Sequence, residues 1–436
     1  MEWAFSCLTP DPGGMHRNTL ITALTAASTL CLFVGSASAA PASECDLVAA
    51  PGGADSAAGT PTAPLATVPG MVNRLADGQT GCFAAGTYNV PNYKVTKPGI
   101  TLTSLDDADA TLKGRFWIAA DGVTFEGLTL NNENQADLPT TVTGANVVLR
   151  DNEITNDHTT ICIALGSEAY GRAVDTLVEG NKIHDCGRLP ATNYDHGIYL
   201  EASDGVIIRD NWIYGNADRG IQLYPDADNT LIERNVIDRN GEGIIFGGSS
   251  ESASDDTIVR NNLITNSKLR DNVESAYGET DPKGKDNLVT DNCISGGAYD
   301  DGDGGILQDA DGFTAQSNLL VDPRYVNAAA GDYTLQAGSP CLAVIGGEGV
   351  ETELSLKSSK RRVHTGRKFR LKGKALGAAR VTVKVQRGGA WRAVDSAKVR
   401  DGKFSTKIRP RRPGKAQFKA VAKDAESGAV KVQVRR

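Results

Sequence analysis

Short runs of β-branched and apolar residues recur along the chain, and each run ends at an asparagine. Residues 147–154, for example, read Val-Val-Leu-Arg-Asp-Asn-Glu-Ile. The asparagines of the seven copies are Asn152, Asn181, Asn211, Asn235, Asn262, Asn292 and Asn318, at intervals of 29, 30, 24, 27, 30 and 26 residues. A repeat of roughly 20–50 residues whose length varies while its strands stay in register predicts a solenoid.

Asparagine suits the corner between two such strands for two physical reasons. It tolerates a left-handed backbone, and stacked asparagine side chains can hydrogen-bond from one coil to the next. Residues 123–130 form a degenerate earlier copy, in which Leu128 stands where asparagine is expected.

A second pattern, Gly-Ile followed by one residue and an apolar residue, occurs in residues 196–201, 219–224 and 242–247, at equal intervals of 23 residues. These segments are therefore expected to be neighbouring strands with equivalent positions in columns. Because side chains alternate along a strand, burying Ile198 and Leu200 sends Tyr199 and Glu201 outward. The same parity places Gln222, Tyr224, Ile245 and Gly247 on the outer face.

The seven asparagine runs resemble those of right-handed parallel β-helix proteins of the pectate-lyase-like kind, over roughly residues 65–345. Residues 69–88 are similar to the short helix that caps the N-terminal end of such proteins, and residues 322–341 are similar to their closing segment. The resemblance implies the fold, but it leaves the activity open, because this scaffold carries lyases, epimerases, hydrolases and adhesins.

After the Gly-rich residues 346–350, apolar and polar residues alternate in about seven short runs, which resemble the basic Ig-like modules appended to many secreted bacterial enzymes. We therefore expect an all-β protein: a right-handed parallel β-helix with an N-terminal cap over residues 40–345, a linker over 346–350, and an Ig-like β-sandwich over 351–436.

Charge separates the two expected domains. Residues 351–436 contain 26 Lys and Arg against 6 Asp and Glu, which leaves 20 basic and 47 acidic residues for the remainder of the chain. The basic module has few aromatic residues besides Trp391, so it lacks the stacking platform that single-stranded nucleic acid needs. Binding to an anionic cell-wall polymer or acidic polysaccharide is the expected alternative.

Residues 1–39 are typical of an export signal, with a basic start at His16 and Arg17, an apolar run over residues 20–34 and a small-residue cleavage site. Met15 is a plausible alternative start. The expected product is a soluble, secreted monomer that spans no membrane. Six cysteines remain after cleavage, and proximity in sequence suggests the disulfides Cys45–Cys82, Cys162–Cys186 and Cys293–Cys341.

The candidate site lies on the Gly-Ile strands. His196, Tyr199, Arg219, Asp195 and Glu201 are the candidate catalytic residues, and Gln222, Tyr224 and Glu242 are the candidate substrate-binding residues. An imidazole at the wet corner of a β-helix suggests proton transfer or substrate contact. The alternative for Arg219 is an ion pair with Asp195 or Glu242 that only holds the corner.

Aligning residues 161–163 with residues 198–200 places Cys162 in the column of Tyr199, facing outward. A disulfide to Cys186 would then hold residues 185–195 as one wall of a groove, or simply stabilise a long loop. Reduced cysteines would instead allow a metal site with His158, His184 and His196, which is not expected in a secreted protein. No cofactor is expected, although calcium could bind the acidic residues Asp300, Asp301, Asp303, Asp309 and Asp311.

These residues favour a carbohydrate-active enzyme that acts on an acidic polysaccharide by lysis or C5 epimerisation. Both reactions need a cation to neutralise a carboxylate, a base and an acid; Arg219 would neutralise, and His196 and Tyr199 would be base and acid in either order. The chain lacks the Asp-Pro-His run of alginate epimerases and the basic cluster of pectate lyases. Glycoside hydrolysis by Asp195, Glu201 and Glu242, and glycan binding without catalysis, are the alternatives.

Overall fold

The computed structural model describes residues 44–106, 108–133, 138–308, 311–345, 354–374, 380–387, 390–398, 403–422 and 425–436. The expected export signal, the linker and Asp309 lie outside these residues. Among the described residues, no helix is both long and apolar enough to cross a membrane.

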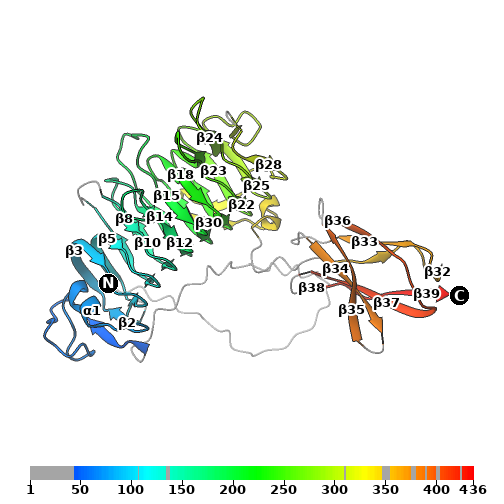
Figure 1. Cartoon of the computed structure of the whole chain (residues 1–436), viewed down its shortest axis with the longest axis horizontal. Coiled ribbons are helices and arrows are strands. Elements are labelled where there is room, and N and C mark those ends of the chain that lie inside the picture. Colours follow the sequence, from blue (N-terminus) through cyan, green and yellow to red (C-terminus); the bar gives the residue numbers. More distant parts are fainter. Residues whose placement is uncertain are drawn as a thin grey trace, which may run out of the picture. The chain divides into compact units, whose positions relative to one another are not determined.

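Residues 47–316 wind into stacked coils whose parallel strands lie on three faces (Figure 1). Face 1 is a sheet of eleven strands that contains the asparagine runs. Its strands are β1 (Leu47–Ala49), β2 (Thr80–Phe83), β4 (Thr101–Ser104), β6 (Thr124–Glu126), β9 (Val148–Arg150), β13 (Leu177–Glu179), β16 (Ile207–Arg209), β19 (Leu231–Glu233), β22 (Ile258–Arg260), β25 (Leu288–Thr290) and β28 (Thr314–Gln316).

Face 2 follows each ladder asparagine, and face 3 carries the Gly-Ile pattern. Face 2 contains β7 (Thr129–Asn131), β10 (Glu153–Thr155), β14 (Lys182–His184), β17 (Trp212–Tyr214), β20 (Val236–Asp238), β23 (Leu263–Ser267) and β26 (Cys293–Gly297). Face 3 contains β8 (Thr140–Val142), β11 (Ile163–Leu165), β15 (Ile198–Asp204), β18 (Arg219–Asp228), β21 (Glu242–Gly247), β24 (Val273–Ala276) and β27 (Ile306–Gln308). The longer strands β3 (Gly86–Val95) and β5 (Ala110–Ile118) join the two faces into one sheet, and β12 (Ala173–Val174) pairs with the end of β15.

The asparagine ladder predicted from the sequence is confirmed. Each ladder side chain from Asn152 to Asn292 donates to the amide oxygen of the next, at 2.9–3.0 Å. The left-handed residue at this corner is not the asparagine, however, but the residue before it, such as Asp151, Asp210 or Arg234. The asparagine therefore keeps an ordinary backbone. Its side-chain amide is buried but hydrogen-bonded, so no polar group is left unsatisfied.

The alternation predicted for face 3 is confirmed on β15 and β18. On β21, in contrast, Ile245 and Gly247, which were expected on the outer face, are buried as well. Ile198, Leu200, Ile221 and Leu223 are fully buried, whereas Tyr199, Glu201, Gln222 and Tyr224 are only partly buried. Each fully buried aliphatic side chain contributes about 1.5–3 kcal/mol of transfer free energy, and the core consists of such columns, one above another.

A helix covers the N-terminal end of the stack, and a C-terminal segment packs on its side. Helix α1 (Val68–Arg74) begins at Thr67, whose hydroxyl accepts from the Gly70 amide, and buries Val68, Met71 and Val72. At the other end, residues 319–345 return over the outside of face 2, with β29 (Tyr325–Asn327), β30 (Asp332–Leu335) and the 3-10 helices Ala328–Ala330 and Pro340–Ala343. Tyr333 and Leu335 of this return segment pack on Val236, Leu263 and Cys293.

The three disulfides expected from the sequence are all present, as Cys45–Cys82, Cys162–Cys186 and Cys293–Cys341. Because the cysteines are oxidised, the metal site that required reduced cysteines is not formed.

The C-terminal residues form a separate set of sheets around their own core of Leu371, Val383, Phe404, Phe418 and neighbouring residues. One sheet contains β31 (Lys357–Ser358), β33 (Phe369–Lys374) and β36 (Lys403–Ile408). The other contains β32 (Arg362–His364), β34 (Arg380–Arg387), β35 (Ala390–Lys398), β37 (Gly414–Ala422), β38 (Ala425–Glu426) and β39 (Val430–Arg435). Two mostly antiparallel sheets around one core are compatible with the expected Ig-like sandwich.

Candidate functional site

Residues 185–195 form a long loop at the corner between faces 2 and 3. Its start is fixed by the Cys162–Cys186 disulfide. Its end is fixed by Asp195, whose carboxylate accepts from Arg188 Nε at 2.7 Å and from the Thr192 hydroxyl at 2.9 Å. Asp218 accepts from the amides of Asn193 and Asp195. The structure therefore places Asp195 in the support of this loop, with its carboxylate fully engaged.

The alignment that put Cys162 in the outer column of Tyr199 is wrong. Ala164 is the residue in register with Tyr199, and Cys162 is fully buried at the corner, with its amide donating to the His196 carbonyl. The error is a shift of two residues, which preserves the apolar alternation and so could not be detected from the pattern.

His196, Arg219 and Glu242 form a corner column, and all three are at least 96 % buried. Arg219 Nε donates to Glu242 Oε2 at 2.8 Å, and Arg219 Nη1 donates to the Asn193 carbonyl at 2.7 Å. The ion pair considered for Arg219 is thus confirmed, with Glu242 as its partner. Removing Glu242 would leave the buried guanidinium of Arg219 without an ion pair among the described residues.

His196 does not lie at a wet corner, contrary to the expectation. Its ring is buried, 5.7 Å from the ring of Tyr199 in an edge-to-face contact, so the side chain turns toward the outer side of face 3. Burial and the charge of Arg219 lower the pKa of His196 well below its usual value, although a contact with Gln222 opposes this. Among the described residues, the buried Nδ1 of His196 and Oε1 of Gln222 have no hydrogen-bond partner. The imidazole is therefore neutral and has an unused nitrogen.

Glu274 and Arg270 complete the cluster, and the sequence reasoning missed both. Glu274 follows Ile245 in the column that begins with Tyr199 and Gln222. Arg270 Nη1 lies 3.6 Å from Glu242 Oε2. The signal for Glu274 was present, because Val273-Glu-Ser-Ala is a degenerate Gly-Ile strand one coil further on.

Glu242 and Glu274 share a proton. Burial and the hydrogen bond with Glu274 raise the pKa of the Glu242 carboxyl to about 8. Two ionised carboxylates can only accept, so this contact is a hydrogen bond only while one of them is protonated. Among the described residues, Oε1 of Glu242 has no other partner.

The shared proton makes stability depend on pH. A raised folded-state pKa means that the folded protein binds a proton that the unfolded chain releases near its ordinary value of 4.5. The resulting stabilisation is complete below that pH and is lost as the pH rises through about 8. The free energy of unfolding, from urea titrations across this range, should therefore fall with pH. Glu242→Gln should remove the part of this pH dependence that comes from Glu242, whereas Glu251→Gln on the surface should not. Identical slopes of the free energy of unfolding against pH for Glu242→Gln and wild type would refute the shared proton.

The outer face beside this cluster carries Tyr199, Glu201, Gln222 and Tyr224. Burial, followed by the charges of Glu201, Tyr224 and Glu168, raises the pKa of Tyr199, so the phenol keeps its proton. Glu201 accepts from the Glu168 amide at 3.0 Å. A Cβ on Gly247 would lie 3.1 Å from Tyr224 Cδ2. The glycine therefore leaves room for the Tyr224 ring.

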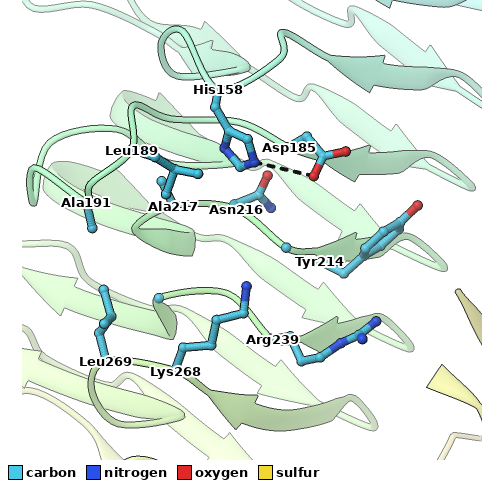
Figure 2. Close-up of a pocket in the computed structure, with 12 residues that line it drawn as sticks. His158, Asp185, Leu189, Ala191, Tyr214, Asn216, Ala217, Arg239, Lys268 and Leu269 are labelled. Atoms are coloured by element: carbon cyan, nitrogen blue, oxygen red, sulfur yellow. Dashed lines mark ion pairs between the residues drawn. The ribbon is translucent and has the colours of Figure 1, made fainter. Parts of the chain in front are cut away.

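Two cavities flank the 185–195 loop. The smaller, of about 190 Å³, is lined by Arg219, Glu242, Arg270 and Asp218 together with residues of the loop. The larger, of about 490 Å³, is shown in Figure 2. The smaller cavity thus opens beside both arginines of the cluster.

The acidic turn considered for calcium uses Asp300 for its own backbone. The Asp300 carboxylate accepts from the amides of Gly296, Gly302 and Gly304, which lower its pKa although burial opposes this. The residues that the structure describes contain no group of three or more His, Cys, Asp or Glu arranged to hold a metal ion.

Comparison with known proteins supports the fold and its predicted hand. Residues 113–318 match the family model described as "Right handed beta helix region". The structure of pectate lyase Pel9A is similar at a TM-score of 0.53 and 15% identity, over 71% of this chain and 90% of that one. XylC in complex with xylose has a TM-score of 0.42 at 12% identity, over 88% and 100% of the two chains. An alginate lyase from Paenibacillus sp. str. FPU-7 has a TM-score of 0.38 at 13% identity, over 58% and 97%. No curated protein matches the chain.

Proposed function

We propose that this chain, with residues 113–318 forming a right-handed parallel β-helix, is a secreted enzyme that acts on an acidic polysaccharide by lysis or C5 epimerisation. The observation that carries the proposal is the cluster at the corner of face 3. Two arginines and Glu242 of this cluster line a cavity, and a neutral imidazole and a protonated phenol belong to the same cluster. The scaffold shared with pectate lyase Pel9A is compatible with such an enzyme.

The chemistry of the substrate explains this set of groups. Removing the proton next to a uronate carboxylate builds negative charge on that carboxylate, so a cation must stabilise it. Arg270 is partly exposed and Arg219 lines the smaller cavity, so the two guanidinium groups can bind the carboxylate through paired N–H donors. While Glu242 is protonated, it supplies no negative charge to Arg219. A bound substrate carboxylate would supply that charge instead.

The two proton-transfer roles follow from the protonation states. His196 is neutral and has an unused nitrogen, so it is available as the base. Tyr199 holds its proton and its ring lies edge to face with that of His196, so we assign to it the acid that donates to the leaving oxygen or to the opposite face of the sugar carbon. Gln222, Tyr224 and Glu201, on the same outer face, would contact the sugar hydroxyls.

Glycoside hydrolysis is supported less well. Its two carboxyl groups stand about 5–5.5 Å or about 6.5–9.5 Å apart, whereas Glu242 and Glu274 are in hydrogen-bond contact. Asp195 is held by Arg188 and Thr192.

The proposal can be tested by incubating the protein with acidic and neutral polysaccharides. Lysis would produce an unsaturated sugar that absorbs in the ultraviolet, and epimerisation in deuterated water would place deuterium on C5. Tyr199→Phe should abolish either signal, because it removes the acid, while Tyr299→Phe on an exposed loop should not. New reducing ends without ultraviolet absorbance would favour hydrolysis, and binding without turnover would favour a non-catalytic glycan-binding protein; neither product nor binding on any acidic glycan would refute the proposal.

We propose further that the basic C-terminal module attaches the protein to an anionic polymer. Arg370, Lys372 and Lys407 are exposed on the paired strands β33 and β36, which gives one positive surface. Retention of the full chain on an anionic polymer at low salt should fall when these three residues are changed to glutamine, and equal retention would refute this role.

A further inference from the structure

The larger cavity lies on the other side of the 185–195 loop, where face 2 meets the corner. It is lined by His158, Asp185, Tyr214, Arg239 and Lys268, with Leu189 and Leu269 at its apolar end (Figure 2). Figure 2 shows the Lys268 side chain extending toward the centre of the cavity, between Leu269 and Arg239. None of these side chains belongs to the cluster around His196.

The two cavities adjoin. Ala191, Gly241 and Leu269 line both of them. In the segment after β23, Lys268 lines the larger cavity and Arg270 lines the smaller one. Two residues of chain span at most about 7 Å. The backbone positions of Lys268 and Arg270 therefore lie within about 7 Å of each other, so one polymer can reach both cavities.

Arg239 and Asp185, in the wall of the larger cavity, already have ion-pair partners. Arg239 donates to Asp238 Oδ2 at 2.8 Å and to the Tyr333 hydroxyl at 2.9 Å. Asp185 lies 2.8 Å from His184 Nδ1 and 3.5 Å from His158 Nε2. Burial opposes protonation of His184, but its bonds to Asp185 and Glu153 raise its pKa to about 9, so the imidazolium is paired with two carboxylates.

Lys268, in contrast, has no ion pair or side-chain hydrogen bond within the part of the chain that the structure describes. Burial and the nearby charge of Arg239 lower its pKa, although the charges of Asp185 and Asp238 oppose this. A ligand anion would compensate this ammonium group.

The apolar end of the cavity suits a ring as well as a charge. Leu189 is 62% exposed and Leu269 is 50% exposed, which is unusual for leucines that line a cavity together. The faces of a sugar ring present C–H groups that can pack on such side chains, while its carboxylate reaches a cation.

We infer that the cavity around Lys268 binds a second acidic sugar residue of the glycan chain whose reacting residue lies at Arg219 and Arg270. The inference rests on the proposed function. It adds that the glycan passes from one cavity to the other across Gly241, around the corner of the β-helix rather than along its axis. The substrate is then a polymer or oligomer with acidic groups on more than one sugar.

The test measures the affinity of the full-length protein for polyuronate oligosaccharides of increasing length by calorimetry. Longer oligosaccharides should bind more tightly than the shortest that binds. Lys268→Ala should weaken binding of the longer ones about tenfold or more, as expected for loss of a charge-assisted hydrogen bond, and leave the shortest unchanged. Lys268→Arg should retain most of the affinity, because it keeps the cation.

Lys285→Ala is the matched control, since Lys285 is an exposed lysine outside both cavities. Equal loss with Lys285→Ala would show general electrostatic attraction, and wild-type affinity of Lys268→Ala for all lengths would show that the cavity is not used. Either result would overturn the inference and leave the proposed function standing. If the wild-type protein binds no acidic oligosaccharide, the proposed function fails and the inference fails with it.

Discussion

Replacing His196 with alanine should reduce turnover of the acidic glycan about 10²–10⁴-fold, the usual contribution of a general base. The buried ring has an unused nitrogen and lies edge to face with the Tyr199 ring. It stands in the corner column with Arg219 and Glu242, which line the smaller cavity. Initial rates of product formation across a range of substrate concentrations would separate turnover from binding. The expected change is in kcat, with KM nearly constant.

Two comparisons make the His196 result interpretable. His364→Ala removes an exposed imidazole from the C-terminal unit and should leave the rate unchanged. Because His196 is buried, thermal unfolding of His196→Ala and of His196→Gln must show that the fold survives. A folded His196→Ala variant with the wild-type rate would remove His196 from the proposed mechanism.

Replacing Asn211 with leucine should lower the free energy of unfolding by about 3 kcal/mol or more. Asn211 is fully buried in the middle of the ladder. Its side chain accepts from the amide and Nδ2 of Asn181 and donates to the carbonyls of Val178 and Arg209 and to Asn235. Leucine has a similar volume but leaves these buried groups without partners. Urea unfolding would measure the loss.

The ladder itself supplies the graded control. Asn318 is the last rung and is partly exposed, so water can replace its hydrogen bonds, and Asn318→Leu should cost much less than Asn211→Leu. Asn73 lies exposed on α1 and should tolerate alanine. Equal losses at Asn211 and Asn318 would contradict a role for buried hydrogen bonds in the ladder.

The repeat determined how much of the fold could be predicted. Seven asparagines recur at intervals of varying length, and only side chains in register can hydrogen-bond from coil to coil. The asparagines therefore predict stacked coils, and the ladder that they form is present. The pattern did not indicate which corner residue takes the left-handed backbone. That role falls on several residue types, among them Asp210, Gly180 and Arg234, so no single residue type marks this position in the sequence.

The site was predictable on the strands but not at the corner. Parity correctly placed Tyr199, Gln222 and Glu201 on the outer face, because the alternation of a strand is fixed. Parity could not show that His196 is buried or that Arg219 pairs with Glu242, because the direction in which a side chain points at a corner depends on packing. Arg270 and Lys268 lie on an irregular segment, and their relation to the loop at residues 185–195 exists only in the fold.

The Cys293–Cys341 disulfide also determines which residues would carry a pulling force applied through the C-terminal module. The chain leaves the β-helix just after Cys341, on its way to the basic C-terminal module. If that module is attached to a surface, tension passes from Cys341 through the covalent bond to Cys293 and bypasses the 47 residues between them. The return segment, whose Tyr333 holds Arg239 at the wall of the larger cavity, would thus remain unloaded while the protein is pulled or sheared.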